Sequence, residues 1–111
     1  MNNPTANKTK VLYIVINAGF SDEIMLIARE AGAKGATIMT ARGEGPMQKS
    51  IMGITVDSEK EILMMLIDDE TADKIMLAVK EKAGRFSAAH GICFTMPVEK
   101  TTIINNFPPK E

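Results

Sequence analysis

The sequence has few of the residues on which metal and redox chemistry depend. Its 111 residues include one cysteine, Cys93, and one histidine, His90. A single thiol cannot form an internal disulfide, and the CxxC pair of heavy-metal-binding domains is missing. Cys93 stands beside Phe94 in an expected strand, and we interpret it as a packing residue. We expect no metal site and no catalytic residue here, because a loop histidine is more often solvated than a general base.

Aromatic residues and surplus charge are also scarce. Aromatic side chains make up 5% of the chain, and 13 basic residues against 14 acidic ones give a formal net charge of −1. A chain without surplus positive charge has little attraction for polyanions. RNA-binding sheets stack bases on aromatic rings of their inner strands, and here Tyr13 and Phe94 are the only rings expected there. Nucleic-acid binding is therefore not expected.

Long hydrophobic runs are missing as well. The longest apolar run, residues 62–67, is far shorter than the roughly 20 residues that a membrane-spanning helix needs. The first ten residues, MNNPTANKTK, lack the apolar core of a signal peptide. We therefore expect a cytoplasmic protein with no direct membrane insertion.

The sequence contains four β-branched or apolar runs of strand length. They lie at residues 10–17, 36–42, 61–67 and 91–98. The chain length fits a single domain. We expect a flexible lead-in at residues 1–9, the folded domain at 10–98 and a C-terminal tail at 99–111.

Amphipathic runs between these strands predict two helices. The first is expected to have Ser21 as its N-cap and to stop at Gly32. The second is expected to begin at Asp68 or Asp69 and to stop at Gly84. Their apolar stripes at helical spacing are Ile24, Ile27, Ala28 and Ala31, then Ala72, Ile75, Met76, Val79 and Ala83. The acidic cluster at the start of the second helix is explained by capping and does not require a catalytic role.

The two helices also resemble one another. DEIMLIARE, from Asp22, and DKIMLAVKE, from Asp73, share Asp, Ile, Met, Leu and Glu in register. Such a repeat favours two stacked βαβ units with right-handed crossovers. We therefore predict an α+β, ferredoxin-like βαβ-βαβ sandwich, in which a four-stranded antiparallel sheet carries two helices on one face.

Both faces of the expected sheet are apolar. If Leu12 and its even-numbered neighbours face the helices, then Val11, Tyr13 and Val15 face away, and the strand at residues 61–67 is apolar on both sides too. A sheet face that met water would alternate with polar residues. Two helices cover only one face, so we expect another subunit to cover the second, with Val15 and Met65 among the residues that it contacts.

Two glycine-containing loops are candidates for anion binding. The turn Gly43, Glu44, Gly45 follows a strand, and its N–H groups could approach phosphate oxygens closely. The loop at residues 84–91 has a glycine at each end and carries Arg85. A plain turn and a plain helix-to-strand loop would explain the same residues, so both interpretations stay open on these features alone.

Three stretches of the sequence together resemble the PII signal-transduction family. They are residues 31–45 (AGAKGATIMTARGEG), residues 59–79 (EKEILMMLIDDETADKIMLAV) and the 84–91 loop with the strand after it. The resemblance covers residues 10–98, and members of this family are trimers of this fold with their sheets packed inside. It implies that the present chain is also a homotrimer, in agreement with its two apolar sheet faces.

The resemblance further implies that ATP or ADP binds in clefts between subunits, with Mg²⁺ accompanying ATP. The residues implied on the adenine side are Gly35, Ala36 and Thr37. Those implied on the phosphate side are Gly43, Glu44, Gly45, Gly84, Arg85 and Gly91. No catalytic residue and no metal-ligating residue is implied, so the resemblance describes a regulator and not an enzyme.

A nucleotide sensor of this kind would contact a partner protein, such as a membrane transporter, through its loop at residues 46–60. That loop is several residues shorter than is usual in the family and has no tyrosine. Met47 stands where the family has a glutamine that helps to hold Mg²⁺ and 2-oxoglutarate, and Ile92 stands where it has a lysine. These departures predict a divergent branch of the family without 2-oxoglutarate sensing.

Two alternatives to a nucleotide sensor stay open on the sequence. One is a structural or metal-tolerance trimer that binds no nucleotide. The other is a small acylphosphatase-like hydrolase on the same fold, which would need a paired arginine and asparagine in an anion loop.

Overall fold

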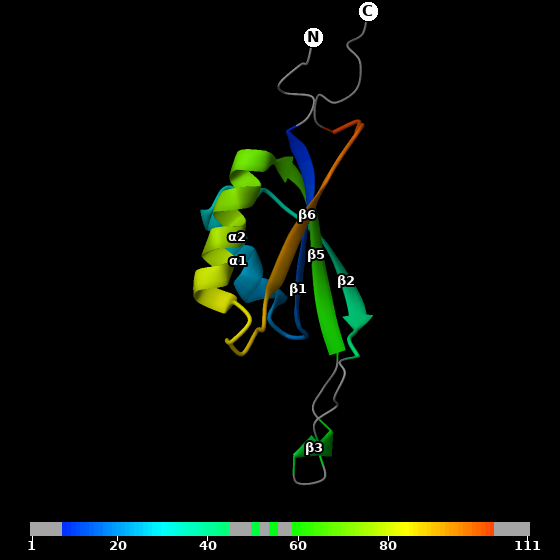
Figure 1. Cartoon of the computed structure of the whole chain (residues 1–111), viewed down its shortest axis with the longest axis vertical. Coiled ribbons are helices and arrows are strands. Elements are labelled where there is room, and N and C mark those ends of the chain that lie inside the picture. The colour runs from blue at the N-terminus through cyan, green and yellow to red at the C-terminus, as the bar shows by residue number, and fades with distance from the viewer. Residues whose placement is uncertain (1–7, 45–49, 52–53, 56–58, 104–111) are drawn as a thin grey trace, which may run out of the picture.

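The computed structural model describes residues 8–44, 50–51, 54–55 and 59–103. In chain order the elements are β1 (Thr9–Asn17), α1 (Ser21–Glu30), β2 (Thr37–Arg42), β3 (Ser50–Ile51), β4 (Ile54–Thr55), β5 (Glu59–Asp68), α2 (Asp69–Ala83) and β6 (Ile92–Pro97). Figure 1 shows both helices on one side of the main sheet. The predicted ferredoxin-like fold is confirmed, and most predicted element ends agree with the structure to within two residues.

The two helices begin in different ways. The side chain of Asp68 accepts hydrogen bonds from the Thr71 N–H at 3.2 Å and from the Thr71 hydroxyl at 2.6 Å, which confirms Asp68 as the N-cap of α2. The prediction for α1 is wrong. Phe20 is its N-cap, no side chain caps the helix, and Ser21 is the first helical residue. The first turn of α1 is stabilised instead by Asp22 and the acid after it, which lie at the positive end of the helix dipole.

The main sheet has the strand order β2-β5-β1-β6, and every neighbouring pair is antiparallel. The register places Leu63 of β5 opposite Ile14 of β1 and opposite Ile38 of β2, while Cys93 of β6 lies opposite Ile14 on the other side. Strands β3 and β4 pair with each other in a separate two-stranded sheet. The register therefore fixes which side chains share each face of the main sheet.

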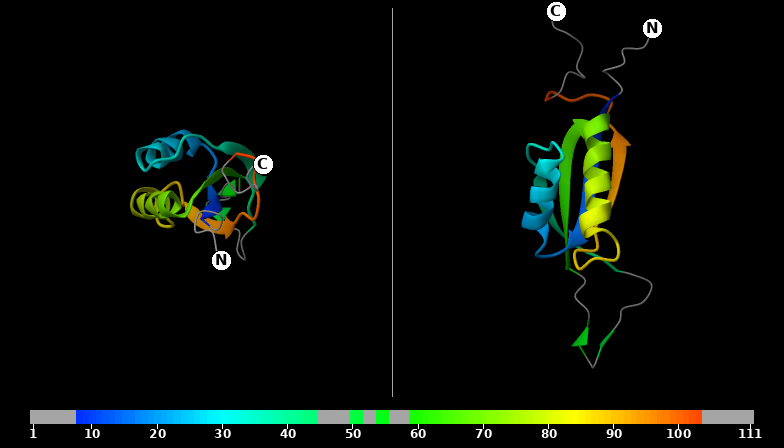
Figure 2. Two further views of the ribbon diagram at one scale, coloured as in Figure 1. Left: turned by 90° about the horizontal axis from the view of Figure 1, so that it is seen from above. Right: turned by 90° about the vertical axis from the view of Figure 1, so that its left-hand side faces the viewer.

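The core lies between the main sheet and the helices. Figure 2 shows α1 and α2 side by side against the same face of the sheet. The largest fully buried side chains of the core are Leu12, Ile14, Ile16, Ile24, Leu63, Ile75 and Val79. Each such aliphatic side chain contributes about 1.5–3 kcal/mol through its burial. The apolar stripes predicted for the two helices supply three of these residues, so the predicted helix faces are largely confirmed.

The opposite face, which we call the open face, carries apolar side chains without any helix over it in the described part of the chain (Figure 2). By register its residues are Val11, Tyr13, Val15, Met39, Ile62, Met64, Leu66, Ile92, Phe94 and Met96. The rings of Tyr13 and Phe94 stack there with centroids 5.2 Å apart. Met65 was expected on this face, and that expectation is wrong: Met65 is 4% exposed and packs under the helices, while Met64 lies on the open face.

Candidate functional site

One end of the main sheet gathers most of the loops singled out in the sequence. It is the end where β1 and β2 finish and where β5 and β6 begin, and we call it the loop end. The register shows this directly, because Arg42 pairs with Glu59 and Asn17 pairs with Lys60. The 84–91 loop joins them there, since the Asn17 N–H donates to the Ala89 carbonyl at 2.8 Å. The turn after β2 and the 84–91 loop, both predicted to meet phosphate, therefore lie at the same end of the sheet.

The side chain of Asn17 links three of these segments. Its Oδ1 accepts a hydrogen bond from Lys60 Nζ at 2.6 Å, and its Nδ2 donates to the carbonyl of Ala88 at 2.9 Å. The opposite chemistry of the two partners fixes the orientation of the carboxamide. Lys60 at the start of β5 is thereby held against the 84–91 loop, although the two are far apart in sequence.

The 84–91 loop is a compact double turn with packing reasons for both of its glycines. A Cβ at Gly84 would lie 2.5 Å from the Lys80 carbonyl oxygen, and one at Gly91 would lie 2.5 Å from that of Ala83. The Gly91 N–H donates to the Ala83 carbonyl at 2.8 Å, so it is engaged in closing the loop. His90 has a φ of 54° and occupies the left-handed region. The glycines at the loop ends are thus required for the fold, whatever the loop binds.

Other N–H groups of this loop are available to a ligand. Within the described residues, the backbone N–H groups of Arg85, Phe86 and Ala88 donate no hydrogen bond. Arg85 is exposed, and its guanidinium lies 5.7 Å from the ring centroid of Phe86, which is itself 96% exposed. Neighbouring N–H donors next to an arginine are a suitable arrangement for phosphate oxygens.

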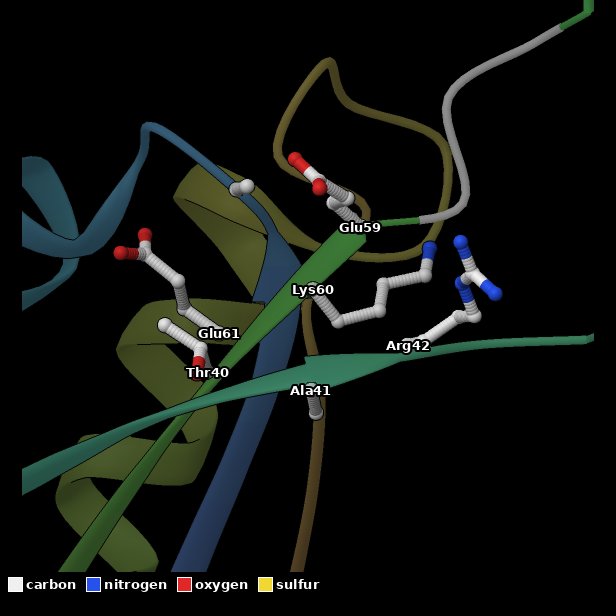
Figure 3. Close-up of a pocket in the computed structure, with 7 residues that line it drawn as sticks. Thr40, Ala41, Arg42, Glu59, Lys60 and Glu61 are labelled. Carbon is white, nitrogen blue, oxygen red and sulfur yellow. The ribbon is translucent and has the colours of Figure 1, made fainter.

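A pocket of about 280 Å³ opens at the loop end. It is lined by Ala18, Thr40, Ala41, Arg42, Glu59, Lys60 and Glu61. Figure 3 shows that the side chains of Lys60 and Arg42 extend to the same side, away from the carboxylates of Glu59 and Glu61. The Glu61 carboxylate accepts a hydrogen bond from the Gly19 N–H at 3.0 Å. The pocket therefore has a cationic side and an acidic side.

The turn after β2 lies next to this pocket. Gly43 is half-buried, and a Cβ there would lie 3.0 Å from Cε of Lys60, so the lysine stem packs against the glycine. Glu44 is exposed. Gly45, predicted to meet phosphate, lies outside the described residues. Glycine at position 43 thus leaves room for the side chain of Lys60, a cation that the sequence analysis did not select.

The three residues predicted on the adenine side lie elsewhere. Gly35 is exposed with open space around it, and Ala36 packs at the margin of the core. Thr37 pairs with Met64 in the middle of β5, five strand residues from Arg42, a distance of about 17 Å along β2. A single chain does not bring these residues to the loop end.

Three residues of the loop end were missed by sequence reasoning: Asn17, Arg42 and Lys60. Asn17 is the last residue of the predicted strand at 10–17, and the two cations lie within longer segments, so none of the three stood out as a site residue. The signal available was a polar residue where β1 ends, but its partners are 43 and 71 positions away. No local pattern identifies such partners.

The described residues provide neither an obvious metal centre nor a reactive thiol. They contain no group of three or more His, Cys, Asp or Glu side chains placed to hold a metal ion. Burial raises the pKa of the Cys93 thiol to about 11, so it is protonated near neutral pH and weakly nucleophilic. No helix in the same residues is long and apolar enough to cross a membrane.

Comparison with known proteins gives a match over most of the chain. Residues 9–106 match the family model described as nitrogen regulatory protein P-II. A search of curated proteins found no match.

Solved structures of this kind have the same fold. A putative PII-like signalling protein from Thermus thermophilus is 24% identical, with a TM-score of 0.64, over 83% of this chain and 88% of that one. The GlnK–ATP complex from B. subtilis is 13% identical, with a TM-score of 0.62, over 82% and 83%. Arabidopsis thaliana PII bound to citrate is 16% identical, with a TM-score of 0.62, over 83% and 78%.

Proposed function

The chain belongs to the nitrogen regulatory protein P-II family, and on that premise we propose that it is a cytoplasmic regulator that binds adenine nucleotides, and not an enzyme. The observation that carries the proposal is the convergence at the loop end. The exposed Arg85 and unpaired N–H groups of the 84–91 loop lie at the same end of the sheet as a pocket of about 280 Å³, which is lined by Arg42 and Lys60 among others. The phosphates of ATP or ADP need closely spaced N–H donors together with cations, and these residues supply both.

A second copy of the chain would complete the site. Thr37 lies about 17 Å along β2 from Arg42, which lines the pocket, so a ligand held at the loop end would not reach Thr37 of the same chain through its phosphates. We propose that Gly35, Ala36 and Thr37 of one subunit meet the adenine of a nucleotide whose phosphates are held by its neighbour. The open face gives the reason for assembly, since burying its apolar side chains between three copies would stabilise a homotrimer.

The regulatory output would pass through the loop at residues 46–60. Its two ends continue from β2 and into β5, next to the pocket. A nucleotide changes such a loop only if it binds the alternative loop states with different affinity. We propose that the loop contacts a protein partner, such as a membrane transporter. Mg²⁺ is proposed only as a companion of ATP, because it is held at such sites by the phosphates with one or two carboxylates.

A structural trimer without a ligand is the second candidate. It is favoured by the packing of Gly84 and Gly91, because both glycines are required by contacts with α2 alone. The acylphosphatase-like hydrolase has less support. The asparagine at the loop end, Asn17, has both ends of its carboxamide engaged by Lys60 and Ala88, so it is not free to orient an attacking water.

Titration calorimetry with ATP, ADP and AMP tests the proposal. We expect binding of ATP and ADP with similar affinity, and Arg85→Ala should weaken it by about tenfold or more through the loss of a charge-assisted contact. Lys74→Ala, on the exposed side of α2, is the matched control and should bind as the wild type does. Absence of heat and of thermal shift at millimolar nucleotide would favour the structural trimer, and steady phosphate release would favour the hydrolase.

A further inference from the structure

Two cations, Lys60 and Arg42, line the pocket at the loop end, and its other charged lining residues are Glu59 and Glu61. Figure 3 shows the charged groups of the two cations on one side of the pocket. Because both cationic side chains extend away from these carboxylates, the side of the pocket that they occupy favours an anion.

Of the two cations, Lys60 is better placed to bind an anion beside the 84–91 loop. Arg42 is exposed, whereas Lys60 is half-buried, with its stem against Gly43 and its ammonium 2.6 Å from Asn17 Oδ1. Asn17 is a neutral acceptor, so it directs the ammonium without cancelling its charge. Because the same carboxamide donates to the Ala88 carbonyl, it holds the ammonium beside the loop whose N–H groups are unpaired.

We propose that Lys60 is a phosphate-binding residue of this site, with Asn17 as its positioning residue. The inference rests on the proposed nucleotide function and adds to it a cation that the sequence did not indicate. The ammonium of Lys60 has three N–H donors, so it can donate to a phosphate at the 84–91 loop while its hydrogen bond to Asn17 Oδ1 is kept. Lys60 is the second residue of β5, so it lies where the 46–60 loop leads into the main sheet.

The variant Lys60→Met tests this assignment, since methionine keeps an unbranched stem against Gly43 and removes the charge. Calorimetry with ADP should show affinity about tenfold or more below that of the wild type. Raising NaCl from about 0.05 M to about 0.5 M should weaken ADP binding by the wild type more than by the variant, because an ionic contact is screened by salt. Lys74→Met, in an exposed position on α2, is the control and should leave both results unchanged.

The possible outcomes separate the two proposals. A wild type that binds ADP and a Lys60→Met variant that binds it within about twofold, with the same salt dependence, overturns the role of Lys60 alone. A wild type that binds neither ADP nor ATP overturns the nucleotide function and this inference with it. If Lys60→Met does not fold, the side-chain amide NMR signals of Asn17 in the wild type decide. They should shift on saturation with ADP, and unchanged signals would contradict the assignment.

Discussion

The two faces of the main sheet are built from similar apolar residues but are covered in different ways. On one face, Leu12 and Leu63 are fully buried beneath α1 and α2. On the open face, Ile92, Phe94 and Met96 stay 47%, 44% and 45% exposed. Adjacent residues of one strand, such as Leu63 and Met64, therefore have very different surroundings. The first face is completed within one chain, and the second has the composition of a surface that another chain covers.

Polar residues border the open face where it reaches the loop end. After Val15 and Ile62, the next pair on this face is Asn17 and Lys60, which hydrogen-bond with each other. An apolar surface that ends in an asparagine and a lysine can be packed against other copies while its margin keeps a polar cleft. The comparison thus links assembly to ligand binding, and four predictions test the account of the two faces and the loop end, from the largest expected effect to the smallest.

A charge on the open face should have the largest effect. Val15→Asp would place a carboxylate without a partner inside the proposed trimer, at a cost of several kcal/mol. We expect sedimentation velocity to show loss of the trimer, with a monomer or unfolded chain in its place. Leu26→Asp is the matched control, because Leu26 is 64% exposed on α1 and its replacement should leave assembly intact. A trimer that persists in Val15→Asp would mean that another surface joins the subunits.

Truncation of two neighbouring residues of β5 should distinguish the roles of the two sheet faces. Leu63→Ala opens a cavity in the core and should lower the free energy of unfolding by about 2–5 kcal/mol, as measured by urea denaturation. Met64→Ala should act mainly on assembly, so its loss of stability should grow as the protein is diluted. Equal losses that do not depend on concentration would show that the two faces are not distinct in solution.

Removing the hydrogen bonds of Asn17 at the loop end should cause an intermediate loss of stability. Asn17→Leu keeps the approximate volume of the side chain but loses its hydrogen bonds with Lys60 and Ala88, and it leaves Lys60 Nζ without that acceptor. We expect the free energy of unfolding to fall by about 1–3 kcal/mol and amide hydrogen exchange to speed up at Ala88. Unchanged exchange in that loop would contradict the role of Asn17 as its anchor.

The smallest loss of stability is expected from a substitution at the start of α2, on the face of the sheet that the helices cover. The hydrogen bond from Thr71 lowers the pKa of the Asp68 carboxyl from its ordinary value of 3.8. Asp68→Ala should cost about 1 kcal/mol at neutral pH through loss of the cap. Because the folded-state pKa is lowered, this stabilisation is fully present above pH 3.8 and is lost as the pH falls through the folded value. Thermal melts of both proteins should therefore converge in acid, and a constant difference would contradict the capping role.

The order of the elements could be predicted because hydrophobic periodicity is a local property. Asp68 could be identified as a cap because its partner, Thr71, is three residues away. The face of Met65 could not be assigned, since β5 is apolar at odd and even positions alike and only pairing with β1 decides between them. Ser21 has the right chemistry for a cap, but the helix begins one position earlier, with the Phe20 carbonyl accepting from the Ile24 N–H.

The candidate site was less accessible to prediction than the fold. Gly43, Arg85 and the 84–91 loop were selected as pieces, and the fold brings them to one end of the sheet. Asn17 and Lys60 were missed because a contact across 43 positions depends on strand register, which no short motif contains. Gly84 and Gly91 were selected for phosphate binding, but their immediate surroundings show that packing against α2 already requires glycine.

The central claim is that copies of this chain cover the open face and, in doing so, complete nucleotide sites that one chain lacks. Native mass spectrometry of the wild-type protein with ADP tests it most directly, because it reports the number of subunits and of bound ligands together. We predict a trimer that takes up as many as three ADP molecules, while Val15→Asp, where it stays folded as a monomer, takes up none. A wild-type monomer that binds ADP by itself, or a trimer that binds none, would contradict the account.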